Sequence, residues 1–363
     1  MRAFDLKKKL LSTVLIDLLL LAAGLLTFAY FHHVRVRDTE KVAIPAAQAA
    51  AASGAQVAPE TVADNASPDE AAQEEAPGTA NAETPVSDGM FGARFADKFA
   101  AGEPQVTDTS YVSENVAVSW EKKTYNDTTY FLTDIYVRDV SCFRTAVALD
   151  YKEFNDGARK NCIQVPQLAN ITDAIVAISG DNYVFRNAGV LAVRNGFELA
   201  NKTGITDDIC IMYYDGTVET FYTKSSAAWR EKIDAVYAKG PYQIWCFGPS
   251  LLDEAGGVPT KFNSSVAEAN PRSAFGYYEP GHYCFLLADG RQKGYSIGFT
   301  LTEMSEIFAA LGCKAAYNLD GGDTVAMAFR GALVNKPEEA QPRDVSDILY
   351  IGEPVAKANL QEG

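Results

Sequence analysis

Histidine is nearly absent from this chain of 363 residues. There are three histidines, and only His282 follows residue 33. The six cysteines include no Cys-x-x-Cys pair, and Cys210, Cys246 and Cys284 each lie in a short apolar run typical of a buried strand. The composition therefore argues against a zinc site built from clustered histidines and cysteines. We expect no metal, no required cofactor and mostly free, buried thiols.

Positive charge is also in short supply. The sequence has 32 lysines and arginines against 47 aspartates and glutamates, which gives a formal net charge of -15. Nucleic acids are bound by basic surfaces that release counterions from the phosphate backbone, so a nucleic-acid partner is not expected. An anionic polymer would need a local basic site.

Aromatic residues are missing from Asp38 to Ser87. This stretch holds nine acids and one base, Lys41, in a background of alanine, proline, threonine and glutamine. Such a composition buries too little apolar surface to offset the entropy lost on folding. We therefore expect residues 32–88 to form a disordered acidic stalk.

One long apolar run lies near the amino terminus. Leu10 to Phe31 is long enough, at helical rise, to cross a hydrocarbon core of about 30 Å. Basic residues precede the run, which places residues 1–9 in the cytoplasm, and no small-residue cleavage pattern follows it. The sequence thus predicts a single-pass cell-membrane protein that contacts the bilayer through residues 10–31 and is otherwise extracytoplasmic.

Residues 89–355 have the composition of one folded α+β domain, a strand-rich mixed domain with a few packed helices. Turn signals such as Asp215-Gly216 separate its apolar runs. The runs expected to be strands are Val116 to Trp120, Tyr130 to Val137, Ala174 to Ser179, Ile209 to Tyr214, Tyr242 to Phe247, Ala274 to Tyr278 and Tyr283 to Ala288.

Two segments of this domain show a helical period. Apolar residues recur within Thr302 to Leu311, with Thr300 or Thr302 as a cap and Gly312 as a stop signal. Phe91, Phe95 and Phe99 follow one another at four-residue spacing, which predicts a short amphipathic helix at the start of the domain with its aromatic side chains in the core.

Three polar clusters stand at the ends of predicted strands, where a scaffold commonly exposes its working groups. They are Asn270-Pro271-Arg272-Ser273, Ala288-Asp289-Gly290-Arg291 and Asn318-Leu319-Asp320-Gly321-Gly322-Asp323-Thr324. Together they supply guanidinium groups, carboxylates and bare backbone, a set that suits an anionic sugar derivative. Simpler interpretations remain open: Asp289-Gly290 as a hairpin turn, and Arg272 as a buried arginine paired to an acid.

The order of these clusters resembles that of the phosphodiester glycosidase family. The resemblance runs from about Phe91 to Gly331 and includes Phe247-Gly248-Pro249, with a weaker match from Ala177 to Asn195. It implies hydrolysis of the sugar C1–oxygen bond of a sugar-1-phosphodiester in a cell-envelope or exopolysaccharide glycan. The implied catalytic carboxylates are Asp320, Asp289 and Asp181. The implied substrate- and phosphate-binding residues are Arg272, Arg291, Arg186, Asn270, Asn318, Gly321, Gly322, Asp323, Thr324 and Ser179.

Two positions depart from the family pattern. Ser179 stands where members usually carry asparagine, and Asp323 where they keep a third glycine. Asp323 brings negative charge to a phosphate site, so an anionic substrate is held less well unless a cation compensates. A non-catalytic glycan-binding or envelope-assembly module is therefore the first alternative, and a metal-dependent phosphodiesterase that uses the aspartates as ligands is the second. The sequence names neither the sugar nor its aglycone.

Overall fold

The computed structural model describes residues 90–148, 162–181, 191–201, 208–339 and 341–354. The expected membrane span, the expected stalk and Arg186 lie outside the described residues. Among the residues that are described, no helix is both long and apolar enough to cross a membrane.

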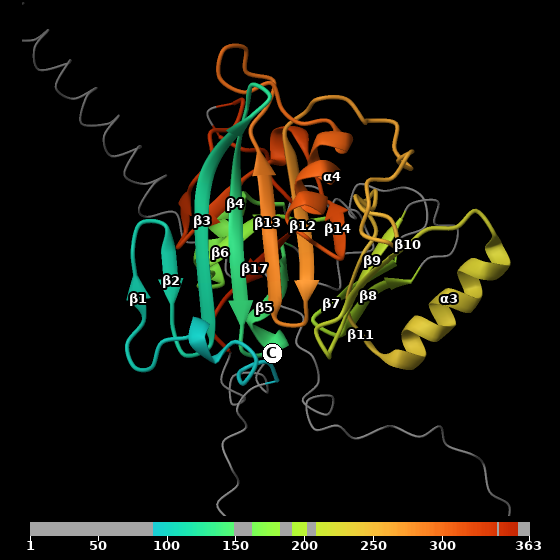
Figure 1. The fold of residues 1–363 in the computed structure, drawn as a ribbon, viewed down its shortest axis with the longest axis horizontal. Coiled ribbons are helices and arrows are strands. Elements are labelled where there is room, and N and C mark those ends of the chain that lie inside the picture. Colours follow the sequence, from blue (N-terminus) through green and yellow to red (C-terminus); the bar gives the residue numbers. More distant parts are fainter. Residues whose placement is uncertain (1–89, 149–161, 182–190, 202–207, 340, 355–363) are drawn as a thin grey trace, which may run out of the picture. The chain divides into compact units, whose positions relative to one another are not determined.

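The described strands form three sheets in which all pairings are antiparallel (Figure 1). The first has the order β1 (Gln105–Val106), β2 (Ser110–Val112), β3 (Val116–Tyr125), β4 (Thr128–Val137), β13 (His282–Ala288), β12 (Arg272–Glu279) and β14 (Ala315–Asn318). The second has the order β10 (Val218–Phe221), β9 (Ile209–Tyr213), β11 (Pro241–Trp245), β7 (Leu191–Arg194) and β8 (Phe197–Asn201). The third has the order β16 (Ala332–Leu333), β15 (Met327–Phe329), β6 (Val176–Ser179), β17 (Asp347–Ile351) and β5 (Phe143–Val147).

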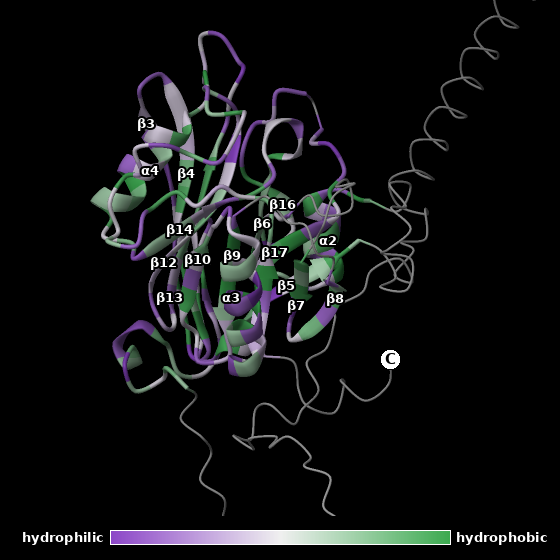
Figure 2. Ribbon diagram, turned by 90° about the vertical axis from the view of Figure 1, so that its right-hand side faces the viewer, coloured by the Kyte–Doolittle hydropathy of each residue, from purple (hydrophilic) through white to green (hydrophobic). Residues whose placement is uncertain are grey.

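Three α-helices and three short 3-10 helices complete the described part of the chain. The α-helices are α2 (Val165–Ile171), α3 (Ser226–Lys239) and α4 (Leu301–Ala310), and the 3-10 helices are η4 (Ala96–Lys98), η5 (Val140–Cys142) and η9 (Gly322–Thr324). Figure 2 shows how apolar and polar residues are distributed over these elements. The predicted α+β class is confirmed.

All three sheets contribute side chains to one shared core, because the side chains of each strand point alternately to its two faces. On β13, Phe285 and Leu287 enter this shared core, whereas Cys284 and Leu286 face the cluster that α4 covers with Met304 and Phe308. Strands β9 and β17 alternate in the same way, with their other faces packed under α3 and α2 respectively. Since successive side chains of a strand point to opposite faces, the central strands of each sheet are buried on both sides.

The predicted strands and the predicted second helix are present. Each of the seven apolar runs lies in a strand, with ends shifted by a few residues, and β3 and β4 extend beyond theirs to meet in a hairpin. Thr300 caps α4 through a capping box with Glu303, and Gly312 follows with a φ of 78°. Asp215-Gly216 forms the turn between β9 and β10.

The predicted helix from Phe91 to Phe99 is wrong. The segment makes turns and then η4, while Phe91 and Phe95 are buried and Phe99 packs against the same core. The amide of Phe91 donates to the Arg138 carbonyl at 2.8 Å, so the first residue of the segment is tied to the chain directly after β4. Because nucleating a helix is costly, a run this short gains more from those contacts than from a regular helix.

Of the two simpler interpretations of the polar clusters, the hairpin turn is wrong and the buried arginine is correct only as to burial. Asp289-Gly290 is no hairpin turn: the amide of Asp289 donates to the Thr129 carbonyl, and a Cβ on Gly290 would lie 2.5 Å from the Pro271 nitrogen. This glycine is needed because two chain segments approach closely. Arg272 is buried as that interpretation requires, but its partners are backbone carbonyls.

Candidate functional site

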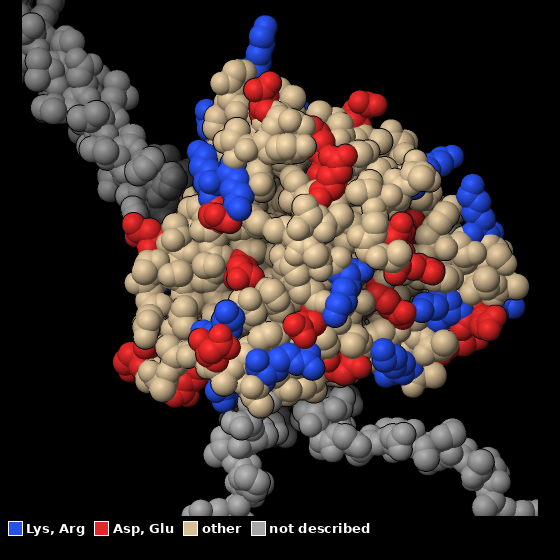
Figure 3. Space-filling model, in the orientation of Figure 1, with Lys and Arg blue, Asp and Glu red and all other residues tan. Residues whose placement is uncertain are grey.

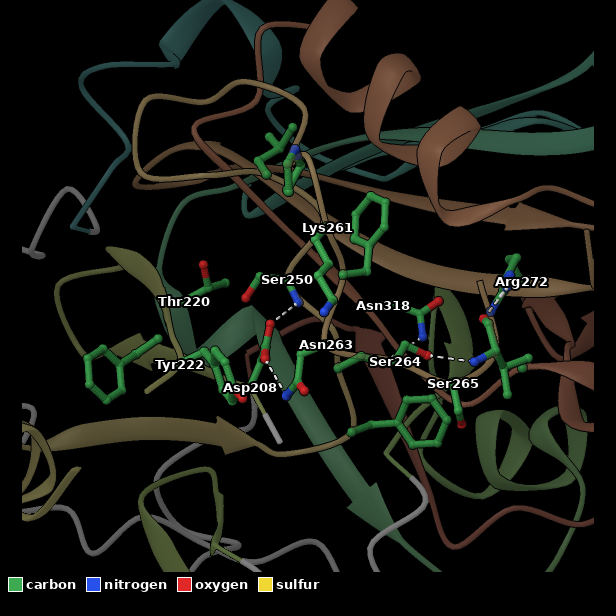
Figure 4. A pocket seen from close by; sticks show the side chains of 18 of the residues that line it. Asp208, Thr220, Tyr222, Ser250, Lys261, Asn263, Ser264, Ser265, Arg272 and Asn318 are labelled. Carbon is green, nitrogen blue, oxygen red and sulfur yellow. Dashed lines mark hydrogen bonds between the residues drawn. The ribbon is translucent and has the colours of Figure 1, made fainter. Parts of the chain in front are cut away.

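A cavity of about 1350 Å³ lies at the end of β12 and β14 where the polar clusters meet (Figure 4). One wall is the chain between β11 and β12, residues 246–271, which contains no helix or strand. The other walls come from the end of β10 and from the segments that follow β13 and β14. Six of the residues predicted for the site line it, namely Asn270, Arg272, Arg291, Asn318, Gly321 and Gly322.

Arg272 begins β12 and fastens one cavity wall. Its Nε donates to the Phe299 carbonyl at 3.1 Å, and its Nη2 donates to the carbonyls of Val266 and Glu268 at 2.8 and 2.6 Å. Burial, helped by the neighbouring Arg291, lowers the pKa of Arg272 to about 10, so the guanidinium stays charged at neutral pH. Its Nη1 makes no hydrogen bond to a described residue, which leaves that group for a ligand.

Arg291 provides the second cation. Its Nη1 lies 2.9 Å from Oδ1 of Asp323 and 3.6 Å from Oε2 of Glu338, while Nε and Nη2 both donate to Oδ1 of Asn270. The side chain is 41% exposed. The extra carboxylate of Asp323 is thus paired with Arg291, the same guanidinium that an anionic ligand would contact.

The glycine pair after β14 brings bare backbone against this arginine. A Cβ on Gly321 would lie 2.9 Å from the Pro271 carbonyl oxygen, and Gly322 adopts a φ of 69°. The amide of Gly322 donates to that same Pro271 oxygen at 3.0 Å, and a Cβ there would meet Arg291 Nη2 at 3.2 Å. Only glycine allows this approach without displacement.

Asn318, the last residue of β14, is buried at the floor of the cavity. Its Nδ2 donates to the Gly248 carbonyl at 2.8 Å, which links β14 to the Phe247-Gly248-Pro249 segment. Its Oδ1 is buried without a hydrogen-bond partner among the described residues. Two predicted motifs therefore meet through one side chain.

Asp320 adjoins the cavity without lining it. Its amide donates to the Gly180 carbonyl at 2.9 Å, and its own carbonyl accepts from Ser179 Oγ at 3.3 Å. Burial raises the pKa of its carboxyl to about 6, against the opposing effects of Thr324 and of Arg343, whose Nη2 lies 3.8 Å from Oδ2. The carboxyl is thus ionised at neutral pH and titrates in mild acid.

Asp181 lies apart from the cavity in a buried ion-pair cluster. Its Oδ2 accepts from Arg194 Nη2 at 3.3 Å and from the Cys246 amide at 2.8 Å, and Arg194 Nε also donates to Asp347 Oδ2 at 3.0 Å. Burial raises the pKa of Asp347, and Arg194 opposes that shift. A Cβ on Gly180 would lie 2.6 Å from Asp347, so the cluster fixes the backbone beside Asp320.

Asp289 is likewise removed from the cavity. Its carboxylate accepts from Tyr295 Oη at 2.8 Å, Asn335 Nδ2 at 2.9 Å and the Lys336 amide at 3.1 Å. Burial raises its pKa, while these hydrogen bonds act in the opposite direction. Asp289 therefore joins loops together. Asp181 and Asp320 are the neighbouring pair, since the charge of Asp181 helps to raise the pKa of Asp320.

Sequence reasoning missed the half of the cavity around Asp208. This residue precedes β9, and its carboxylate accepts from the Ser250 amide at 2.7 Å and from Asn263 Nδ2 at 3.0 Å. Thr220, Tyr222 and Lys261 line the cavity with it. The available signal was an acid placed directly before an apolar strand, which is also what an ordinary loop end looks like.

The positive charge of the site comes from individual arginines and not from an extended basic surface. Figure 3 shows acidic and basic side chains interspersed on the face turned toward the viewer. No three His, Cys, Asp or Glu side chains are grouped for a metal ion within the described ranges. The arrangement offers two guanidinium groups and a tight glycine turn at one end of a large cavity, which suits a phosphate group.

Comparison with known proteins agrees with this geometry. Residues 172–352 match the sequence model of the phosphodiester glycosidases. An uncharacterized prophage-derived protein of Bacillus subtilis, YomE, is 29% identical over 161 residues. The aligned stretch covers 44% of this chain and 24% of that protein.

Among solved structures, the fold is similar to the catalytic domain of zebrafish N-acetylglucosamine-1-phosphodiester alpha-N-acetylglucosaminidase, described as auto-inhibited by its pro-peptide. That match has a TM-score of 0.52 at 17% identity and covers 69% of this chain and 88% of the zebrafish chain. A hypothetical protein from Synechocystis gives a TM-score of 0.48 at 14% identity, covering 69% of this chain and 64% of that one. The likeness to the zebrafish enzyme extends the sequence match to the fold, and residues 172–352 belong to the phosphodiester glycosidase family.

Proposed function

We propose that this protein is a glycosidase that hydrolyses the sugar C1–oxygen bond of a sugar-1-phosphodiester. Family membership supports the reaction class. The observation that carries the proposal is the meeting of Arg272, Arg291 and the Gly321-Gly322 backbone at one end of the cavity. A phosphodiester brings one negative charge and two non-bridging oxygens, which the paired N–H groups of a guanidinium can bind together.

The proposed reaction divides the work between cations and a carboxylate. Water adds to C1 of the sugar, the C1–oxygen bond breaks, and the bonding electrons stay on the phosphate oxygen. The products are a free sugar and a phosphomonoester. Arg272 and Arg291 stabilise the charge on that leaving group, and a phosphate needs little further help from an acid.

Asp320 is the proposed carboxylate. It directly precedes the glycine pair, and with a pKa of about 6 it is ionised at neutral pH. A carboxylate beside C1 stabilises the positive charge that develops on the sugar ring or directs the attacking water. Asp208 is the competing candidate, because it lines the cavity itself.

The test is a sugar-release assay on the full-length chain in detergent, with the methyl phosphodiester of N-acetylglucosamine 1-phosphate as substrate. Losing one preorganised electrostatic contact costs a factor of about 10² to 10³ in rate, so Asp320→Asn should lose that much turnover while binding is largely kept. If Asp208→Asn loses turnover and Asp320→Asn does not, the carboxylate is misassigned. If the wild-type chain releases no sugar from any phosphodiester tested, the proposed activity is refuted.

A glycan-binding module without turnover is the second candidate. It is favoured by one observation, the 2.9 Å contact between Arg291 Nη1 and Asp323, because that carboxylate competes with a substrate phosphate for the same guanidinium. The same assay separates the two, since a binder takes up the phosphodiester without releasing sugar.

The proposed setting is the outer face of a cell membrane. The apolar run at 10–31 would anchor the chain, with residues 1–9 in the cytoplasm, a stalk at 32–88 and the glycosidase domain at 89–355. A cell-envelope or exopolysaccharide glycan is the substrate that such a placement would offer.

A further inference from the structure

The cavity is larger than a single sugar phosphate requires. Sites for drug-sized ligands occupy about 300 to 1000 Å³, and this cavity measures about 1350 Å³. The two arginines and the glycine pair account for one end of it. The remaining volume is large enough to admit a further part of a ligand.

The opposite half of the cavity differs in chemistry. Figure 4 shows Thr220, Tyr222 and Asp208 on the far side of the cavity from Asn318 and Arg272. The guanidinium groups are thus at one end, while an aromatic ring, hydroxyl groups and a carboxylate are at the other. Lys224 and Lys261 also line the cavity, so charges of both signs lie near Asp208, and this half suits a polar ligand with hydroxyl groups better than a second phosphate.

The chain at the end of β10 supplies this half. Thr220 lies on β10, Tyr222 directly follows the strand, and both residues line the cavity. Phe221 packs between them against Trp229 of α3, with ring centroids 5.7 Å apart, which anchors the strand end. Tyr222 is only partly buried and makes no ring contact of its own with another described residue.

The floor of this half is held rigidly. Asp208 accepts hydrogen bonds from the Ser250 amide and from Asn263, both of which belong to the wall at 246–271. Lys261 of the same wall reaches the cavity between the two halves in Figure 4. A ligand that enters here meets polar groups that are already fixed, so little ordering free energy is lost on binding.

We propose that the half around Tyr222, Thr220 and Asp208 is a subsite for a second, uncharged sugar unit. This inference rests on the proposed function and specifies its substrate class: an oligosaccharide or polysaccharide joined through C1 to a phosphodiester. The phosphate lies at the arginines, and the glycan chain extends from the reacting sugar toward Tyr222. A sugar ring has an apolar C–H face that suits an aromatic ring and hydroxyl edges that suit polar side chains.

The test compares two methyl phosphodiesters, one of N-acetylglucosamine 1-phosphate and one of the corresponding β1,4-linked trisaccharide 1-phosphate. An aromatic contact is worth about tenfold in affinity, so the wild-type KM should be about tenfold lower for the trisaccharide. Tyr222→Ala should bring the ratio of the two KM values close to one, and Tyr222→Phe should keep most of it. Tyr125→Ala removes an exposed tyrosine on β3 and should leave the ratio unchanged.

A second readout separates this inference from the proposed activity. Calorimetry with the neutral trisaccharide alone measures the subsite without any hydrolysis. Binding that is lost in Tyr222→Ala supports the subsite even where neither phosphodiester is cleaved. A wild-type KM ratio near one, a ratio that survives Tyr222→Ala, or the absence of trisaccharide binding overturns it.

Discussion

The buried carboxyl of Asp320 should make stability depend on pH between about 4 and 6. Its pKa is raised from 3.8 to about 6 in the folded protein, chiefly because burial disfavours the ionised form. The folded state then binds the proton more tightly than the unfolded state does. The contribution to stability is therefore fully present below pH 3.8 and is lost as the pH rises through about 6.

The size of this loss of stability follows from the shift in the pKa of Asp320. About two pKa units correspond to roughly 3 kcal/mol, since one unit is worth about 1.4 kcal/mol. Asp320→Asn removes the titrating group, so the unfolding free energy of the variant minus that of the wild type should rise by up to about 3 kcal/mol from pH 4 to pH 7. Taking this difference cancels the contributions of the other titrating groups, which both proteins share.

The assay is urea unfolding of both proteins at half-unit steps from pH 4 to pH 7.5, followed by circular dichroism. Ser305→Ala, a buried polar change elsewhere, serves as control and should give a difference that is flat with pH. A flat difference for Asp320→Asn, or one that falls with pH, would refute the assignment of the shift to burial. Turnover by the wild type should in turn rise through about pH 6 as the carboxylate forms.

Three further outcomes are expected. Arg272→Ala should lower the unfolding free energy by roughly 3 kcal/mol, because three hydrogen bonds from a buried guanidinium to the carbonyls of Phe299, Val266 and Glu268 are lost, and a urea midpoint that barely moves would contradict this. Asp323→Gly should lower the KM for a phosphodiester about fivefold, because it frees Arg291 from an exposed ion pair, whereas an unchanged or higher KM would show that the pair does not compete with substrate. Mild protease on intact cells should release a soluble fragment that begins near Phe91, and protection until lysis would reverse the proposed topology.

Local patterns in the sequence were sufficient for most individual elements. A short, continuous apolar run such as that of β13 marks a buried strand, and the capping residue Thr300 marks the start of α4. The sheet order was not accessible in the same way. The pairing of β4 with β13 joins residues far apart in the chain, and no short-range pattern encodes such a contact.

The site could be predicted only in part for a related reason. Glycines and arginines next to strand ends drew attention to Arg272, Arg291 and the pair at Gly321, and the structure brings these residues together. The carboxylates were harder, because spacing does not say to which side a loop residue turns. Asp289 turns toward Asn335 and Tyr295, whereas Asp208, which carries no motif, lines the cavity.

The wall formed by residues 246–271 is attached to the scaffold by side chains in or next to the strands. Asp208 holds Ser250 and Asn263, Asn318 holds Gly248, and Arg272 holds the carbonyls that end the wall. In two of these attachments, at Asn318 and Arg272, the wall contributes only backbone carbonyl groups, which every residue type provides. Much of the wall sequence can therefore change without disturbing the sheets or the arginines at the end of the cavity.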